Sequence, residues 1–167
     1  VPLADVGKGL TPPKKPGGDR TLGEPALVNS DKGKADTPSL ACAAGSCFLV
    51  WHGEANTGAS AAFIETDPAK AQSQPVLRRK ISRTGGRPAV AYSAAGQAQV
   101  VWFESKQILT ASMTRDGMGP VSRIARVSGD QPPPSIVAGD KPGEWYVAWL
   151  DYETGHLEAY AARIACR

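Results

Sequence analysis

Short apolar runs that end in tryptophan recur along the chain and are separated by polar turns. The clearest run reads "GSCFLVWHGE", from Gly45 to Glu54, and similar runs return as "AQVVWFES" and "EWYVAWLDY". Apolar residues stand at consecutive positions in each run, so both faces of a strand would be apolar. A strand with one solvated face alternates apolar and polar residues instead. The pattern therefore predicts strands that are covered on both sides.

The three runs belong to a longer repeat. The tryptophans that end them are 51 and 47 residues apart, at Trp51, Trp102 and Trp149. A proline opens a strand-like segment 13 to 15 residues before each tryptophan, at Pro38, Pro88 and Pro134. Another proline opens one 13 or 14 residues earlier, at Pro25, Pro75 and Pro120. A fourth segment follows each tryptophan after a polar turn, from Ala59, Gln107 and His156. A sheet tolerates proline at the first residue of a strand, so we expect the prolines to begin strands.

Each repeat unit therefore holds four predicted strands in about 45 to 50 residues, the size of a propeller blade. We predict an all-β fold, a partial β-propeller of about three four-stranded blades. The units lie near residues 24–70, 74–116 and 119–164 of a propeller segment, 24–167, which follows an extended Pro-, Gly- and Lys-rich leader at 1–23. In such a fold the tryptophans fill the space between blades and are not a ligand platform.

The repeat template resembles that of secreted bacterial β-propellers built from "P-x-V-A … Y-V-V-W-x-D … I-x-A-x-R-V" repeats, which look similar to sialidase-like propellers. The resemblance covers residues 24–164 and rests on the repeat, not on a functional motif. Sialidase blades carry an Asp-box, Ser-x-Asp-x-Gly-x-Thr-Trp. The nearest stretch here, "TRDGMGPV", has Asp116 and Gly117 at a different spacing and no tryptophan. The resemblance implies a secreted propeller and does not extend to sialidase activity.

Three blades do not close a ring, because propellers close with about four to eight. The ends of an open arc would expose apolar blade faces, which favour association. We therefore expect another chain or a second copy to complete the ring. Two copies would give six blades around a twofold axis, and the alternative is a sister fragment cut from a longer precursor. The segment that opens at Pro25 would then complete a preceding blade by joining a partner's sheet.

The composition agrees with short strands joined by turns, since the chain has 18 glycines and 14 prolines. The formal charge is +3, and even the most basic stretches, such as "KISRTGGR", lack the interleaved aromatic residues of a nucleic-acid surface. No run approaches the roughly 20 apolar residues that span a bilayer. No signal segment opens the chain. We expect neither a nucleic-acid partner nor a membrane span.

The cysteines indicate the compartment. Cys42 and Cys47 bracket the turn-forming residues "AAGS", which predicts a disulfide across the neck of a hairpin. The alternative is two reduced, buried cysteines. A disulfide implies an oxidising environment, so we predict a secreted, periplasmic or cell-surface protein. Cys166 is left over as a candidate interchain thiol, beside Arg167, where a trypsin-like protease would cut a precursor.

No catalytic motif is visible. The serines lack a nucleophile-elbow context, and His52 and His156 have no partners at metal-ligand spacing. Cys47 and His52 are an odd number of residues apart, so they point to opposite faces of a strand. We lean toward a protein that is not an enzyme and predict no metal site and no cofactor.

One polar pattern repeats just past each tryptophan, where the chain carries Glu54, Glu104 and Asp151. These acids belong to the same connection of the repeat, so they would lie on one rim of the ring. Together with His52 and Tyr152 they form the predicted ligand-binding set, with Asn56 and Glu153 beside them. Such an edge could hydrogen-bond sugar hydroxyls or hold a calcium ion. The alternative is that the acids are solvated turn residues.

These observations favour an extracellular recognition or scaffold module that acts as part of an assembled β-propeller, with carbohydrate as a candidate ligand. The main alternative is a subunit or processed fragment of a glycan-acting hydrolase or lyase whose active site lies mostly in the missing blades. A structural subunit without a small ligand is a third interpretation. The expected partner is another propeller-forming chain or a second copy of this one.

Overall fold

The computed structural model describes residues 35–43, 45–53, 58–66, 76–129 and 132–165. Within these ranges the chain forms eleven β-strands and no helix, which confirms the predicted all-β class. The strands are β1 (Ala35–Ala43), β2 (Ser46–Gly53), β3 (Gly58–Glu65), β4 (Val76–Lys80), β5 (Gly86–Tyr92), β6 (Ala98–Glu104), β7 (Gln107–Met113), β8 (Ser122–Arg126), β9 (Ser135–Ala138), β10 (Glu144–Asp151) and β11 (Glu158–Ala165).

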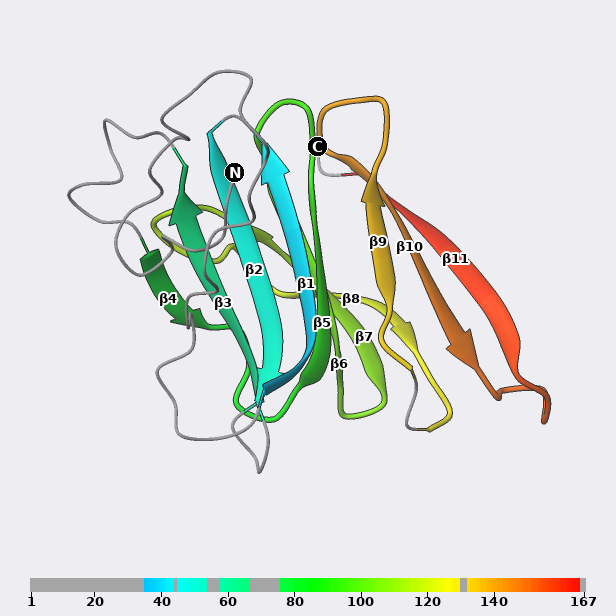
Figure 1. Ribbon diagram of the computed structural model, residues 1–167. Coiled ribbons are helices and arrows are strands. Elements are labelled where there is room, and N and C mark those ends of the chain that lie inside the picture. Colours follow the sequence, from blue (N-terminus) through cyan, green and yellow to red (C-terminus); the bar gives the residue numbers. More distant parts are fainter. Residues whose placement is uncertain (1–34, 44, 54–57, 67–75, 130–131, 166–167) are drawn as a thin grey trace, which may run out of the picture.

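The strands form three separate antiparallel sheets that follow one another along the chain (Figure 1). The first sheet has the order β1-β2-β3-β4, the second β5-β6-β7-β8, and the third β11-β10-β9. Within each sheet, every strand pairs with the strands that precede and follow it in that sheet, and all the pairs are antiparallel. The boundaries of the sheets differ from those of the sequence units. Strands β4 and β8 lie in the opening segments of the second and third units, yet they pair with β3 and β7 of the preceding units.

A hydrophobic core fills the space between the first and second sheets. Its largest side chains are Phe48 of β2 and Trp102 of β6, each 1% exposed. Phe48 meets Phe63 edge-on, with ring centroids 5.2 Å apart, and Tyr92 at 5.6 Å. The core is completed by Val50, Ala59, Ala61, Ile81, Val90, Ala98, Val100, Ala111 and Met113. Fully burying one large apolar side chain stabilises a fold by about 1.5–3 kcal/mol, so this core is what holds the two sheets together.

A second core lies between the second and third sheets. Trp145 of β10 packs there with Val101 and Ile108 of the second sheet. The other buried members are Ala91, Val127, Ile136 and Val147. Strand β6 therefore buries alternate side chains on opposite faces, with Trp102 toward the first sheet and Val101 toward the third. This confirms the two-sided burial that its apolar run predicts.

The third sheet is covered on one face only. Its side chains Ile136, Trp145 and Val147 enter the core. On the opposite face, Val137 is 59% exposed and Tyr146 is 46% exposed. The two-sided burial expected for the third tryptophan strand is thus not met in this chain, because none of the described strands lies beyond this face (Figure 1).

Two of the repeat prolines lie inside strands, whereas the sequence predicts that they begin them. Strands β1 and β5 both shift register where Pro38 and Pro88 stand. The preceding residues Thr37 and Arg87 have left-handed φ angles of 44° and 54°, which cost roughly 1–3 kcal/mol each for residues other than glycine. A bulge leaves its extra residue outside the ladder, so a proline there removes no paired N–H.

Candidate functional site

The described members of the predicted ligand-binding set lie where β2, β6 and β10 end. His52 is the last residue but one of β2, and Glu104 and Asp151 are the final residues of β6 and β10. Strands β2 and β10 point the same way in Figure 1. Tyr152 follows directly and is 53% exposed. The remaining member, Glu54, lies outside the described residues, as does the neighbouring Asn56.

Glu104 holds the connection that leads from β4 to β5. Its Oε1 accepts a hydrogen bond from the Thr84 hydroxyl, and its Oε2 accepts one from the indole Nε1 of Trp102 at 2.9 Å. Burial raises the pKa of Glu104, but side-chain hydrogen bonds from Thr84, Trp102 and Ser82 outweigh it and lower that pKa overall. The carboxylate is therefore an ionised anchor for the connection between two sheets.

Asp151 makes the same kind of contact one repeat later. It is only 2% exposed, and its Oδ1 accepts hydrogen bonds from the backbone N–H of Ser128 at 2.9 Å, from the Ser128 hydroxyl, and from the backbone N–H of Tyr152 at 2.7 Å. Burial raises the pKa of Asp151, and these hydrogen bonds lower it by more. Ser128 lies between β8 and β9, so Asp151 also fixes the connection between successive sheets.

His52 lies against the same connection as Glu104. Its Nδ1 is 3.1 Å from Oδ1 of Asp36 in β1. A Cβ atom on Gly86 would lie 2.8 Å from the imidazole Nε2, and one on Gly85 would lie 2.6 Å from the indole of Trp102. The two glycines of "KISRTGGR" therefore allow two rings to pack on the backbone. Sequence reasoning treats this stretch as basic and misses the packing role of its glycine pair.

The structure attaches these side chains to the connections between sheets. Glu104 and His52 contact one connection and its end, through Thr84 and Gly86, whereas Asp151 contacts the next through Ser128. Across the described ranges, no group of three or more His, Cys, Asp or Glu residues could hold a metal ion. The ligand-binding role of the set stays a prediction, and its two described acids have hydrogen-bond partners within the chain.

A groove of about 370 Å³ lies where the three sheets meet, at the start of β1, β5 and β9. Its lining comes from matching positions of the three repeats, namely Thr37, Pro38, Ser39, Pro88, Ala89, Pro133, Pro134, Ser135 and Ile136. The Ser39 hydroxyl accepts the backbone N–H of Val90 at 3.2 Å and so links β1 to β5. The lining offers three hydroxyls and no charged side chain. Sequence reasoning missed this groove, although the shared prolines mark it.

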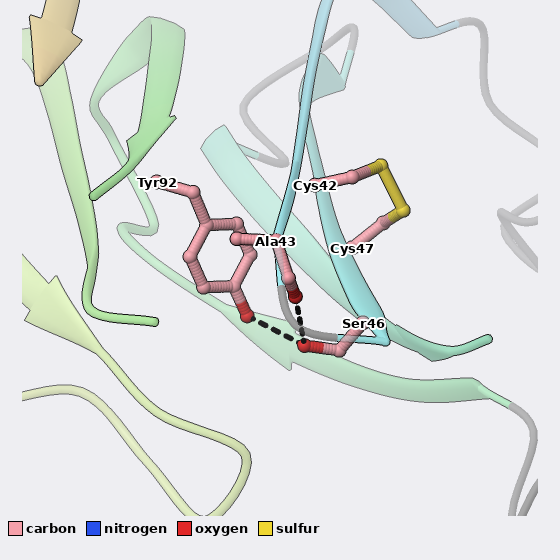
Figure 2. The surroundings of a disulfide bond; sticks show 5 residues. All are labelled: Cys42, Ala43, Ser46, Cys47 and Tyr92. Carbon is pink, nitrogen blue, oxygen red and sulfur yellow. Dashed lines mark hydrogen bonds between the residues drawn. A yellow bond between two sulfur atoms is a disulfide. The ribbon is translucent and has the colours of Figure 1, made fainter. Parts of the chain in front are cut away.

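The predicted disulfide between Cys42 and Cys47 is present (Figure 2). The two cysteines are direct partners across β1 and β2, with Cα atoms 4.0 Å apart. Ser46 begins β2 directly after the turn, and its hydroxyl lies 3.0 Å from the phenol oxygen of Tyr92 in β5 and donates to the Ala43 carbonyl at 3.3 Å (Figure 2). The disulfide therefore stabilises a turn through which the first sheet contacts the second.

The disulfide is compatible with an extracellular protein, because such bonds persist in oxidising compartments. The described part of the chain contains no helix that is long and apolar enough to cross a membrane. The candidate interchain thiol, Cys166, lies outside the described residues.

Comparison with known proteins adds no family: no protein-family model matches the chain, and no curated protein matches it.

Proposed function

We propose that this chain is an extracellular recognition or scaffold module that works as part of an assembled β-propeller. Three observations support the proposal. Each sheet is a meander of consecutive strands, the sheets stack in chain order, and β1, β5 and β9 lie next to one another at the inner edges. This is how the blades of a propeller are arranged. A module of this kind acts through the surfaces that it presents to other chains.

The sheets pack in the same orientation at both interfaces inside the chain. The tryptophan face of the second sheet, with Trp102, packs on Phe48 of the first sheet. The tryptophan face of the third sheet, with Trp149, packs in turn on Val101 of the second sheet. In each case, the face opposite the tryptophan of one sheet covers the tryptophan face of the next. The outward face of the third sheet is the face opposite Trp149. In the same order of contacts it would cover the tryptophan face of a fourth sheet, and none of the described strands forms such a sheet.

The exposure of that outward face carries the proposal. Tyr146, at its centre, pairs with Val137 on one side and Arg163 on the other, and Ala148 pairs with Ala161. Both Val137 and Tyr146 are largely exposed. Exposed apolar side chains that lie side by side mark an interaction site. Beside Val137 and Tyr146 lies Arg163, whose Nε is 3.4 Å from the Glu144 carboxylate, and a sheet face of this kind can pack on a second sheet, as within the chain.

The geometry supports the scaffold role better than carbohydrate binding. Glu104 and Asp151, which a sugar would need as acceptors, are engaged by Thr84 and Ser128. Carbohydrate binding stays a prediction, and so does the alternative of a hydrolase or lyase fragment. A glycan panel incubated with the chain separates these two, because a binding module retains the glycan unchanged and an enzyme depletes it.

The mass of the full chain in solution tests the proposal. We expect assemblies larger than the 17.5 kDa of one chain, measured by light scattering with and without reductant. Tyr146→Asp should reduce the mass, because it places a charge on the outward face. Tyr152→Asp is the matched control, since Tyr152 is 53% exposed, against 46% for Tyr146, but lies past the end of β10. A soluble, folded monomer that is indifferent to Tyr146→Asp would contradict the proposal.

A further inference from the structure

Charge is distributed unevenly over the described residues. Residues 76–129, which contain β4 and the whole second sheet, include nine Lys and Arg residues and only two acids, Glu104 and Asp116. The other described ranges include two Lys and Arg residues and seven Asp and Glu residues. The net charge of +3 for the whole chain therefore conceals one strongly basic region.

The outermost strands of the first two sheets carry much of this positive charge. Arg78, Arg79 and Lys80 stand in β4, and Arg123 and Arg126 stand in β8. Charged residues on an edge strand discourage unwanted strand pairing, and a mixture of signs would serve that purpose. Neither β4 nor β8 contains an acid, so protection of the edges does not account for the uniform sign.

Strand pairing turns arginines of the two edge strands toward the same seam. Arg79 pairs with Ala61, which belongs to the core between the first and second sheets. Arg123 pairs with Leu109, which packs against that core from the second sheet. Direct partners in antiparallel strands present their side chains on one face of the sheet. Arg79 and Arg123 therefore lie on the sides of their sheets that face each other.

Arg126 lies on the same side of the second sheet as Arg123. It pairs with Gln107, which in turn pairs with Glu104. Glu104 stands two positions after Trp102 in β6, so the two share a face, and Trp102 belongs to the core between the first two sheets. We call Arg79, Arg123 and Arg126 the arginine edge.

A direct contact links the two sheets beside this edge. The Nη2 of Arg79 donates to the carbonyl of Arg115 at 2.6 Å, in the connection between β7 and β8. The Nε of Arg79 is buried without a hydrogen-bond partner. In the part of the chain that the structure describes, none of the three guanidinium groups of the arginine edge forms an ion pair with a carboxylate. Clustered charges of one sign raise the local potential and attract ions of the opposite sign.

The surroundings indicate which kind of anion this surface suits. Arginine forms paired hydrogen bonds with carboxylates and with tetrahedral oxyanions. Strands β4 and β8 contain no aromatic residue, whereas single-stranded nucleic acid stacks its bases on aromatic side chains. Within residues 76–129, Val121 is the one exposed large apolar side chain, whereas surfaces that bind the membrane interface bury an apolar face there. A polysaccharide with acidic groups needs neither stacking nor insertion.

We propose that the outer edges of the first and second sheets bind an acidic polysaccharide, whose carboxylate or sulfate groups contact Arg79, Arg123 and Arg126. The Cys42–Cys47 disulfide is compatible with an extracellular protein, and acidic polysaccharides are extracellular polymers. The inference goes beyond the proposed function, because this surface belongs to the first two sheets and not to the outward face of the third.

Binding of the full chain to dextran sulfate, polygalacturonate and neutral dextran tests the proposal by isothermal titration calorimetry. We expect binding to the two acidic polymers and none to dextran, with an affinity that falls as salt is added because salt screens the charges. Arg123→Glu should weaken binding by about tenfold, because it replaces an attraction by a repulsion. Lys141→Glu is the matched control, since it changes the charge equally at an exposed residue before β10, and it should leave the affinity nearly unchanged.

Arg126→Gln provides a second, milder test if Arg123→Glu impairs folding, and circular dichroism shows whether each variant is folded. Equal losses in Arg123→Glu and Lys141→Glu would show a response to net charge alone and overturn the site. Tighter binding to single-stranded DNA or to phosphatidylglycerol vesicles than to either acidic polysaccharide would overturn the choice of ligand. Tyr146→Asp should leave polysaccharide binding intact even where it reduces the mass of the assembly, so failure of the proposed function and failure of this inference are distinguishable.

Discussion

The indole Nε1 of Trp102 donates a hydrogen bond to Oε2 of Glu104 at 2.9 Å. The two residues stand two positions apart at the end of β6, so their side chains share one face of the strand. The other oxygen of Glu104 accepts from Thr84, in the connection that leads to β5. A buried tryptophan and a rim acid, which are separate features of the sequence, thus form one unit that fixes how successive sheets are joined.

Glu104→Ala should destabilise the fold by about 1–3 kcal/mol, because a buried donor on Trp102 loses its acceptor. Urea unfolding monitored by tryptophan fluorescence measures the change. Glu153→Ala is the control, since Glu153 is exposed in the turn after β10 and surface changes stay within about 0.5 kcal/mol. Equal stability of the two variants would show that Glu104 does not anchor the connection.

Acid should weaken the fold through Asp151 and Glu104. Hydrogen bonds lower the pKa of both carboxyls in the folded chain. Their stabilisation is therefore complete above the unfolded pKa values, about 4, and is lost as the pH falls through the lower folded values. Unfolding free energies measured between pH 7 and pH 3 should fall at the acid end. Asp151→Asn should flatten that decline, and an unchanged slope in this variant would contradict the assignment.

Gly85→Ala should destabilise the second sheet by roughly 1–3 kcal/mol, as overpacking of a core does. The new methyl would lie 2.6 Å from the indole of Trp102, which is 1% exposed. Gly117→Ala is the matched control, because a Cβ atom there meets nothing within 4 Å. Thermal unfolding compares the two variants, and similar melting temperatures would show that Trp102 yields to the methyl.

Loss of the Cys42–Cys47 disulfide should lower stability by about 2 kcal/mol, the chain-entropy value for so short a loop. The double variant Cys42→Ser, Cys47→Ser should melt at the temperature that the natural chain reaches in reductant. The contact between Ser46 and Tyr92 depends on the same turn, so the near-UV signal of tyrosine should change as well. Cys166→Ser serves as the control and should keep the full effect of reductant.

Much of the local structure was predictable from the sequence. The repeated apolar runs predicted the strands, because alternation and turn residues are properties of neighbouring positions. The two cysteines predicted the disulfide for the same reason, since a hairpin brings its own ends together. The two-sided burial of β6 was also predictable, because its apolar residues stand at consecutive positions.

Only the tertiary structure decided which groups meet across the chain. The partners of Asp151 and Glu104 lie 23 and 20 residues away, in connections that the sequence does not relate to them. The glycines beside Trp102 and His52 acquire their role from rings on other strands. The sequence by itself determined the strands and their repeat, which depend on local pattern. The coverage of each face and the partner of each carboxylate depend on how whole sheets pack, and long-range packing is not encoded at any single position.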